Sequence, residues 1–248
     1  MPDEPRLSHP VLALAFKLAL TPLLVTQALR TRRRAPVLPE AAGSRDGRAG
    51  RGEGTPIRLL VAGDSSAAGV GVAHQDQAVV GYLVRTLEAH RPGPIVWRLC
   101  ARTGLTTRAV LELLRAAPPA PADVAVVITG VNDVVEQIPV CRALAQRAAL
   151  ADWLLGQGLA RHVVFAPLPP MHQFPLLPQP LRSVIGADAR RHDHALARWA
   201  ATRSDVSVAT MAVELTPETM ASDGFHPGEP VYRACGEALG LHVARHLA

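Results

Sequence analysis

From Ile57 to the C-terminus, short apolar runs alternate with longer segments in which apolar residues recur every three or four positions. The first pattern is typical of buried strands, and the second is typical of helices that pack on a sheet. Consecutive parallel strands must be joined by right-handed crossovers, which place helices on the faces of the sheet. We therefore predict an α/β fold, a three-layer α/β/α sandwich with a mostly parallel five-stranded sheet.

The predicted strands are Ile57–Ala62, Ile95–Cys100, Val124–Thr129, His162–Ala166 and Val206–Met211. The predicted helices between and after them are Gln77–Gly93, Thr106–Pro119, Val140–Gly158, Arg190–Arg203 and Pro230–His246. The composition agrees with this fold, because 48% of the residues are apolar but only 4% are aromatic. A core of Ala, Leu and Val suits a parallel sheet covered by helices.

The first 35 residues form an apolar and basic segment of a different kind. Val11–Leu29 is long enough to span a bilayer, although Lys17 and Pro22 lie inside it. The arginines at 30 and 32–34 favour the anionic cytoplasmic surface of a membrane. We expect residues 1–35 to be a candidate anchor that holds a cytoplasmic protein on the inner face of the membrane through residues 11–34. The alternative is a helix that packs on the domain itself.

Residues 36–56 separate this segment from the predicted domain, residues 57–248. They are rich in Gly, Arg and Pro and lack apolar periodicity, so we expect a flexible linker. Residues 1–53 hold nine Lys and Arg against five Asp and Glu, whereas the rest of the chain holds 17 against 16. The domain itself is nearly neutral, and we expect no nucleic-acid partner. Three cysteines without paired spacing indicate neither a disulfide framework nor a zinc site.

Polar residues follow three of the predicted strands at the ends where ligands bind in such folds. The first strand leads into Asp64–Ser65, the second into a loop with Gly104, and the third into Asn132. Near the C-terminus, Asp223 and His226 lie three residues apart in one short turn. We expect these residues to border one crevice.

The loop after the first strand has three interpretations. A phosphate-binding loop is disfavoured, because neither the required Lys nor a third glycine is present and Asp64 would repel a phosphate. A nucleophile is favoured if His226 accepts the proton of Ser65 and Asp223 orients that imidazole. The backbone N–H of Ser65, the N–H of Gly104 and the Asn132 amide are then candidate oxyanion donors. Taken singly, each of these residues also fits a plain turn or a helix cap.

Four blocks, "AGDSSAAGVG", "ARTGLTT", "TGVNDV" and "SDGFHP", resemble the signature blocks of the SGNH/GDSL hydrolases, in the expected order. The resemblance covers Ile57 to the C-terminus. It implies Ser65 as nucleophile, His226 as base with Asp223 as its orienting acid, and Gly104 and Asn132 as oxyanion donors beside the Ser65 N–H. It also implies a flavodoxin-like sandwich without metal or organic cofactor. Ser66 stands where the family name has Leu, and the α/β-hydrolase elbow is absent, so Ser65 should lie in a loop that leads to a helix.

Other polar residues receive structural interpretations. Asp64 should bond nearby backbone N–H groups, and Asp133 should start a helix. His192 and His194 are two apart on a predicted helix, so we expect solvated surface rather than a metal pair.

The small residues 67–69 should leave room beside Ser65 for an acyl group. Met171, His172 and Phe174 lie in a long apolar loop that either forms a substrate wall or packs on its own core.

The sequence thus predicts a serine esterase that acts on small-molecule or lipid-like acyl esters of short to medium chain. Two alternatives use the same fold. One is an acyltransferase or a carbohydrate O-deacetylase with the same residues, and the other is a membrane-tethered binding module without turnover. Oligomeric state and natural substrate stay open.

Overall fold

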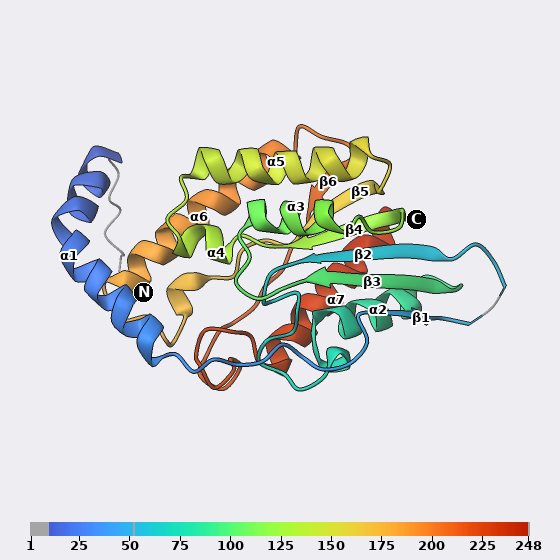
Figure 1. The fold of residues 1–248 in the computed structure, drawn as a ribbon, viewed down its shortest axis with the longest axis horizontal. Coiled ribbons are helices and arrows are strands. Elements are labelled where there is room, and N and C mark those ends of the chain that lie inside the picture. Colours follow the sequence, from blue (N-terminus) through green and yellow to red (C-terminus); the bar gives the residue numbers. More distant parts are fainter. Residues whose placement is uncertain (1–9, 52, 248) are drawn as a thin grey trace.

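The computed structural model describes residues 10–51 and 53–247 (Figure 1). Its strands are β1 (Asp46–Ala49), β2 (Ile57–Gly63), β3 (Ile95–Ala101), β4 (Ala122–Ile128), β5 (Ala160–Phe165) and β6 (Val206–Val208). Its α-helices are α1 (Pro10–Arg34), α2 (Val79–His90), α3 (Thr107–Ala116), α4 (Val131–Val135), α5 (Val140–Gly156), α6 (Leu181–Ala200) and α7 (Glu229–His246). Two short 3-10 helices, η1 (Gln75–Gln77) and η2 (Met171–Gln173), lie in the connections.

Within the described residues, six strands form one sheet in the order β1-β3-β2-β4-β5-β6. Every neighbouring pair is parallel except β1 and β3. The five parallel strands follow the flavodoxin-like order, in which the second strand lies outside the first. The predicted α/β sandwich is confirmed, and the sheet has one strand more than expected.

Helices cover both faces of the sheet. In Figure 1, α3 and α5 lie above the strands, whereas α2 and α7 lie below them. Helices α2 and α7 approach each other closely, because a Cβ added to Gly236 of α7 would lie 2.4 Å from the Cβ of Tyr82 of α2. Val61, Val126 and Val163 between the layers are fully buried, as expected for parallel strands covered on both sides. This packed body leaves the loops at the carboxyl ends of the strands as the place for a site.

Residues 40–49 differ from the predicted flexible linker. Asp46–Ala49 pair antiparallel with β3, and the N–H of Leu99 donates to the carbonyl of Arg45 at 2.7 Å. Gly47 permits this pairing beneath Trp97, whose ring would lie 2.9 Å from an added Cβ. The linker prediction is therefore wrong for these residues. A short edge strand pairs through its backbone and tolerates charged side chains, so it carries no apolar periodicity.

The second half of α1 packs on the folded domain. Leu24 is buried in an apolar cluster with residues of η2 and α6. The side-chain amide of Gln27 donates to the carbonyl of Gln179 at 2.7 Å and accepts from the N–H of Leu181 at 3.2 Å. Across residues 10–51 and 53–247, the structure contains no helix with the length and apolar character needed to cross a membrane. The first nine residues of the predicted anchor lie outside the described residues.

Candidate active site

Ser65 lies in the turn that follows β2. Gly63 ends this strand where a Cβ would be 2.1 Å from the carbonyl oxygen of Ile128 on β4, so glycine alone fits between the strands. The chain then turns helically, with the N–H of Ala68 bonded to the carbonyl of Asp64 at 2.9 Å. Gln137 is the only non-glycine residue with positive φ among those described, and Ser65 therefore occupies unstrained backbone. The expected loop leading to a helix is present, in place of a strained elbow.

Ser65, His226 and Asp223 form a continuous line of hydrogen bonds. The Oγ of Ser65 lies 3.0 Å from Nε2 of His226, and Nδ1 of the same ring lies 2.5 Å from Oδ2 of Asp223. Ser65 and Asp223 are 7% and 4% exposed. An imidazole held in this way has one nitrogen directed at the hydroxyl and the other fixed by the carboxylate, which is the geometry needed to accept the hydroxyl proton.

The turn that carries Asp223 also keeps this carboxylate ionised. Its Oδ1 accepts the backbone N–H groups of Phe225 and His226, both at 2.9 Å. Burial alone would raise the pKa of Asp223, but the hydrogen bonds from the His226 ring and from these N–H groups hold it below its usual value. The turn also packs on the Ser65 loop, because a Cβ on Gly71 would lie 2.4 Å from the carbonyl oxygen of Pro227. Local geometry thus fixes His226 relative to Ser65.

The two other predicted donors follow the strands that flank β2. Gly63 pairs with Ala101 of β3 on one side and with Ile128 of β4 on the other. Gly104 follows β3 with φ +80°, a conformation that favours glycine. Asn132 follows β4, and its amide donates to the carbonyl of Leu105 at 2.9 Å. This bond joins the two loops next to the Ser65 turn, although one Asn132 N–H is used in making it.

A cavity of about 370 Å³ opens beside Ser65 and His226. Met171, His172 and Phe174 all line it, and Met171 and Phe174 are almost fully buried. Gly186 of α6 lets this loop come close, since a Cβ there would lie 2.5 Å from the Cβ of His172. The structure thus places the three predicted wall residues at the cavity, and their contact with substrate stays a prediction.

Other residues that line this cavity were not predicted from the sequence. Ala189 of α6 and Val231 of α7 line the cavity, as do Met211, Val213 and Leu215. Glu214 is the only polar residue between the last three, since position 212 is Ala, so the sequence carries little period-two signal for this part of the wall. Strand β6 ends at Val208, three residues before the predicted end at Met211. The segment beyond it lines the cavity instead of extending the sheet.

A family model for the GDSL-like lipase/acylhydrolase family matches residues 61–234. The chain belongs to this family. It is therefore an acylhydrolase of the GDSL type, and the resemblance read from the four blocks is confirmed. No curated protein matches the chain.

Several solved structures share the fold of this GDSL acylhydrolase. One is the psychrotrophic esterase EstA from Pseudoalteromonas sp., at 18% identity over 75% of this chain and 98% of that chain, with a TM-score of 0.53. A lipolytic protein of the G-D-S-L family from Veillonella parvula has 15% identity over 75% and 97%, with a TM-score of 0.56. The lipase/acylhydrolase from Enterococcus faecalis has 18% identity over 76% and 96%, with a TM-score of 0.54.

Beside Ser65, the GDSL acylhydrolase buries the carboxyl group of Asp64. Its Oδ1 accepts the N–H of Ser66 at 3.0 Å, as the loop-shaping prediction requires. Its Oδ2 has no hydrogen-bond partner among the described residues. Burial raises the pKa of Asp64 to about 7, and the negative charge of Asp133 adds to this effect. Asp64 therefore changes its charge near neutral pH, next to the candidate nucleophile.

Asp133 and Arg147 form a second layer of buried charge that sequence reasoning partly missed. Asp133, in the first turn of α4, accepts the N–H and hydroxyl of Thr107 at 2.9 and 2.5 Å, and so has the predicted structural role. Arg147 of α5 is 1% exposed, and its guanidinium lies against Gly130, where a Cβ would be 1.9 Å from Nη2. Burial lowers the pKa of Arg147, an effect that Asp133 and two other carboxylates oppose. An arginine inside an apolar helical stripe was the available signal.

Two smaller predictions are wrong. His192 is 3% exposed, whereas His194 is exposed as expected. Residues two apart on a helix point about 200° apart, so one of the pair must face the domain.

The small residues after Ser65 also face inward. Ala67 and Ala68 are fully buried, and a Cβ on Gly69 would lie 2.8 Å from the Cβ atoms of Ala41 and Ala78. Their small size therefore permits close packing and does not leave room for a substrate.

In the described part of the chain, no group of three or more His, Cys, Asp or Glu could hold a metal ion.

Proposed function

We propose that this acylhydrolase is a serine esterase whose nucleophile is Ser65. The observation that carries the proposal is the hydrogen-bonded line from Asp223 through His226 to Ser65, which ends at a mainly apolar cavity. Such a line activates a hydroxyl that is otherwise barely nucleophilic. The cavity supplies the space beside that hydroxyl for the acyl part of a substrate.

The proposed reaction has two halves. The Oγ of Ser65 bonds to the ester carbonyl carbon while its proton moves to Nε2 of His226, and Asp223 stabilises the imidazolium that results. The oxyanion accepts hydrogen bonds from the N–H groups of Ser65 and Gly104 and from the Asn132 amide. The tetrahedral species then breaks its bond to the alcohol oxygen, which takes the proton from His226. Water repeats the same steps on the acyl-enzyme and releases the carboxylic acid.

The cavity supports an acyl group of short to medium length. Its volume of about 370 Å³ lies at the lower end of the range of roughly 300–1,000 Å³ for small-molecule sites. Its buried wall includes Met171, Phe174 and Leu215, which favour an alkyl chain over a sugar. The same residues would also serve transfer of the acyl group to an alcohol. Product analysis with and without an added alcohol acceptor separates hydrolysis from transfer.

The test is a chain-length series of acyl nitrophenyl esters with wild type, Ser65→Ala and Ala189→Leu. We expect wild type to prefer short to medium chains and Ser65→Ala to be inactive. Ala189 is 3% exposed and lines the cavity, so Leu there should lower kcat/KM for the longer chains by about tenfold and spare acetate. Ser65 should also react with a fluorophosphonate probe. Equal activity from wild type and Ser65→Ala would refute the proposal, and a protein that neither turns over esters nor takes the probe would be a binding module.

We further propose that α1 contacts an anionic lipid surface. Leu23, Val25 and Leu29 are 45%, 51% and 52% exposed, and arginines 30 and 32–34 beside them are exposed. Apolar and basic groups together favour the interface of anionic bilayers. Sedimentation with vesicles tests this: binding to vesicles that contain phosphatidylserine, and its loss in Leu29→Glu, is expected. A protein that stays in the supernatant with these vesicles contradicts the proposal.

A further inference from the structure

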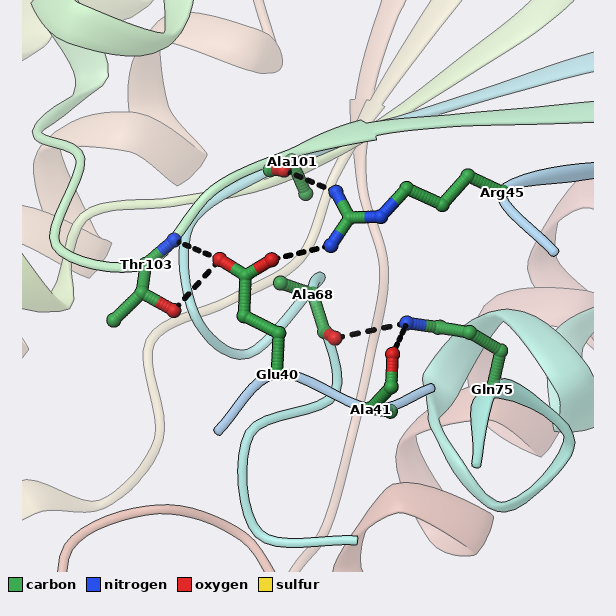
Figure 2. A network of polar contacts seen from close by, with 7 residues as sticks. All are labelled: Glu40, Ala41, Arg45, Ala68, Gln75, Ala101 and Thr103. Atoms are coloured by element: carbon green, nitrogen blue, oxygen red, sulfur yellow. Dashed lines mark hydrogen bonds and ion pairs between the residues drawn. The ribbon is translucent and has the colours of Figure 1, made fainter. Parts of the chain in front are cut away.

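Residues 40–49, here called the N-terminal strap, join two of the loops that form the candidate site (Figure 2). The strap lies outside residues 61–234, the part of the chain that the family model matches. Its strand β1 fixes it on the edge of β3. The residues before β1 continue past the ends of β3 and β2, where Gly104 and Ser65 follow. A segment outside the family match therefore reaches the candidate site.

One end of the strap is bonded to the loop that carries Gly104. The Oε1 of Glu40 accepts both the N–H and the hydroxyl of Thr103, at 2.7 and 2.8 Å. Its Oε2 pairs with the guanidinium of Arg45, which also donates to the carbonyl of Ala101 at 2.6 Å. Figure 2 shows the Glu40 carboxylate between Thr103 and Arg45. Glu40 and Arg45 thereby bond the strap to Thr103 and Ala101, the two ends of the short segment that precedes Gly104.

The other contact of the strap is with the Ser65 turn. The N–H of Ala41 donates to the carbonyl of Ala68 at 3.2 Å. The buried side-chain amide of Gln75 donates to the carbonyl oxygens of Ala41 and Ala68, at 3.1 and 2.9 Å. Figure 2 shows the two bonds from the Gln75 amide. The strap is thus anchored on the nucleophile turn and holds the neighbouring loop from that anchor.

Glycine needs such a support at this position. Gly104 has φ +80°, and no atom would lie within 4 Å of a Cβ there, so neither a side chain of its own nor packing on that side restricts its backbone. Glycine loses more conformational freedom on ordering than any other residue. Thr103, the residue just before it, is held at two atoms by Glu40, which limits rotation of the peptide unit that contains the Gly104 N–H.

We propose that Glu40 is a positioning residue for the oxyanion donor at Gly104, acting through Thr103. This inference rests on the proposed function, in which Gly104 donates to the oxyanion. Preorganised donors act mainly on the transition state, and a misdirected donor lowers kcat more than it raises KM. The charge on Glu40 suits this role. Burial would raise the pKa of Glu40, but the hydrogen bonds from Thr103 and the charge of Arg45 hold it below its usual value.

Asp123 provides a matched control at the opposite end of the strands. Its Oδ2 accepts the N–H of Arg58 at 2.8 Å, and its Oδ1 pairs with the Arg58 guanidinium at 3.2 Å. It thus resembles Glu40 in accepting one backbone N–H and one arginine. It lies at the start of β4, away from the loops of the site. Asp123→Ala should therefore lower Tm to a similar extent while leaving kcat unchanged.

The experiment measures kcat, KM and Tm for the full chain and its variants with one nitrophenyl ester. We expect Glu40→Ala to lower kcat about 10- to 100-fold with KM within about threefold, as for loss of part of an oxyanion hole. Glu40→Gln keeps the Oε1 acceptor for Thr103 and should recover most of kcat. Thr103→Val removes only the hydroxyl donor and should lower kcat severalfold, which keeps the test valid if Glu40→Ala does not fold.

Two results would overturn the inference. One is wild-type kcat in both Glu40→Ala and Thr103→Val, and the other is an equal loss of kcat in Glu40→Ala and Asp123→Ala. In both cases Ser65→Ala must still be inactive, so the proposed function survives. Full activity in Ser65→Ala would instead refute the proposed function itself.

Discussion

Ser65 and Ser207 each share hydrogen bonds with histidine, in two different parts of the domain. Ser65 lies 3.0 Å from His226 at the carboxyl ends of the strands. Ser207, the middle residue of β6, lies between His162 of β5 and His242 of α7, at 2.8 and 2.9 Å. The serine–histidine distances are similar at the two places. The partner of each imidazole and the space beside each hydroxyl are different.

The ring of His226 is bonded to a buried carboxylate, and the cavity reaches both His226 and Ser65. The ring of His162 instead stacks on His246, with centroids 3.5 Å apart, and Ser207 is not among the residues that line this cavity. Burial and the neighbouring His246 and His242 lower the pKa of His162 to about 4. A hydrogen bond between serine and histidine is therefore not enough to assign a nucleophile. The carboxylate, the adjacent donors and the space for a substrate distinguish the two.

The strongest test of this comparison removes each hydroxyl in turn. If Ser65 is the nucleophile as proposed, Ser65→Ala should lower kcat for ester hydrolysis by roughly 10⁴- to 10⁶-fold, as loss of the nucleophile does in serine hydrolases. Ser207→Ala should leave kcat within about twofold. Steady-state kinetics with a nitrophenyl ester measure both. A large loss of kcat in Ser207→Ala would contradict the assignment of the reactive pair.

The second test concerns the orienting carboxylate. Asp223→Asn should lower kcat by roughly 10³- to 10⁴-fold, because an amide no longer holds the tautomer that accepts the serine proton. Asp205→Asn near His162 should change kcat by less than about twofold. If Asp223→Asn kept more than a tenth of wild-type kcat, the carboxylate would be dispensable.

The third test uses the pH dependence of stability near Ser65. The pKa of Asp64 is raised to about 7 in the folded chain, above its ordinary value near 4. The folded state thus binds this proton more tightly than the unfolded state does. The protonated carboxyl therefore adds to the stability of the folded chain at low pH, and this contribution is lost as pH rises towards 7. The wild-type free energy of unfolding should fall by up to about 4 kcal/mol between pH 4 and 7 because of this group, and Asp64→Asn should remove that fall. Urea unfolding at several pH values measures it, and parallel curves for both proteins would contradict the raised pKa.

The fourth test applies the same measurement to the other pair, with the opposite sign. The pKa of His162 is about 4 in the folded chain, below its ordinary value near 6.5, so the unfolded chain binds the proton more tightly. Stability should fall as pH drops from 6.5 towards 4. With allowance for screening by nearby solvent, His162→Gln should reduce this fall by about 1 to 2 kcal/mol. If the free energy of unfolding of the variant fell between pH 6.5 and 4 as much as that of wild type, His162 would not be the group responsible.

Sequence reasoning predicted the parallel strands and the residues of the Ser–His–Asp line, because both are expressed locally. A buried strand shows itself as an apolar run, as in β4, and a reactive loop shows itself where that run ends in polar residues. Asp223 and His226 lie in one turn, so their spacing already suggested their contact. The family blocks then supplied the order in which these loops combine.

What sequence reasoning missed depends on contacts between distant parts of the chain. Glu40 meets Thr103, 63 residues away, and nothing in the Gly- and Arg-rich sequence around Glu40 indicates that partner. The inward orientation of His192 depends on which face of α6 packs on the domain. The two-residue spacing between His192 and His194 does not show which of them lies on that face. The cavity wall combines η2, α6 and the segment after β6. Its shape is set by packing between elements, and the pattern within each element predicts only which side chains are apolar.

The pairing of β1 with β3 also determines where this chain can be shortened. The antiparallel strand covers the outer edge of β3, on which Val96 is 39% exposed. A chain that began at residue 57 would present that edge with unpaired N–H and C=O groups, and such edges add strands from other molecules. The minimal soluble form of this hydrolase should therefore begin before Glu40, ahead of the first residue of the family match, and shorter forms should aggregate.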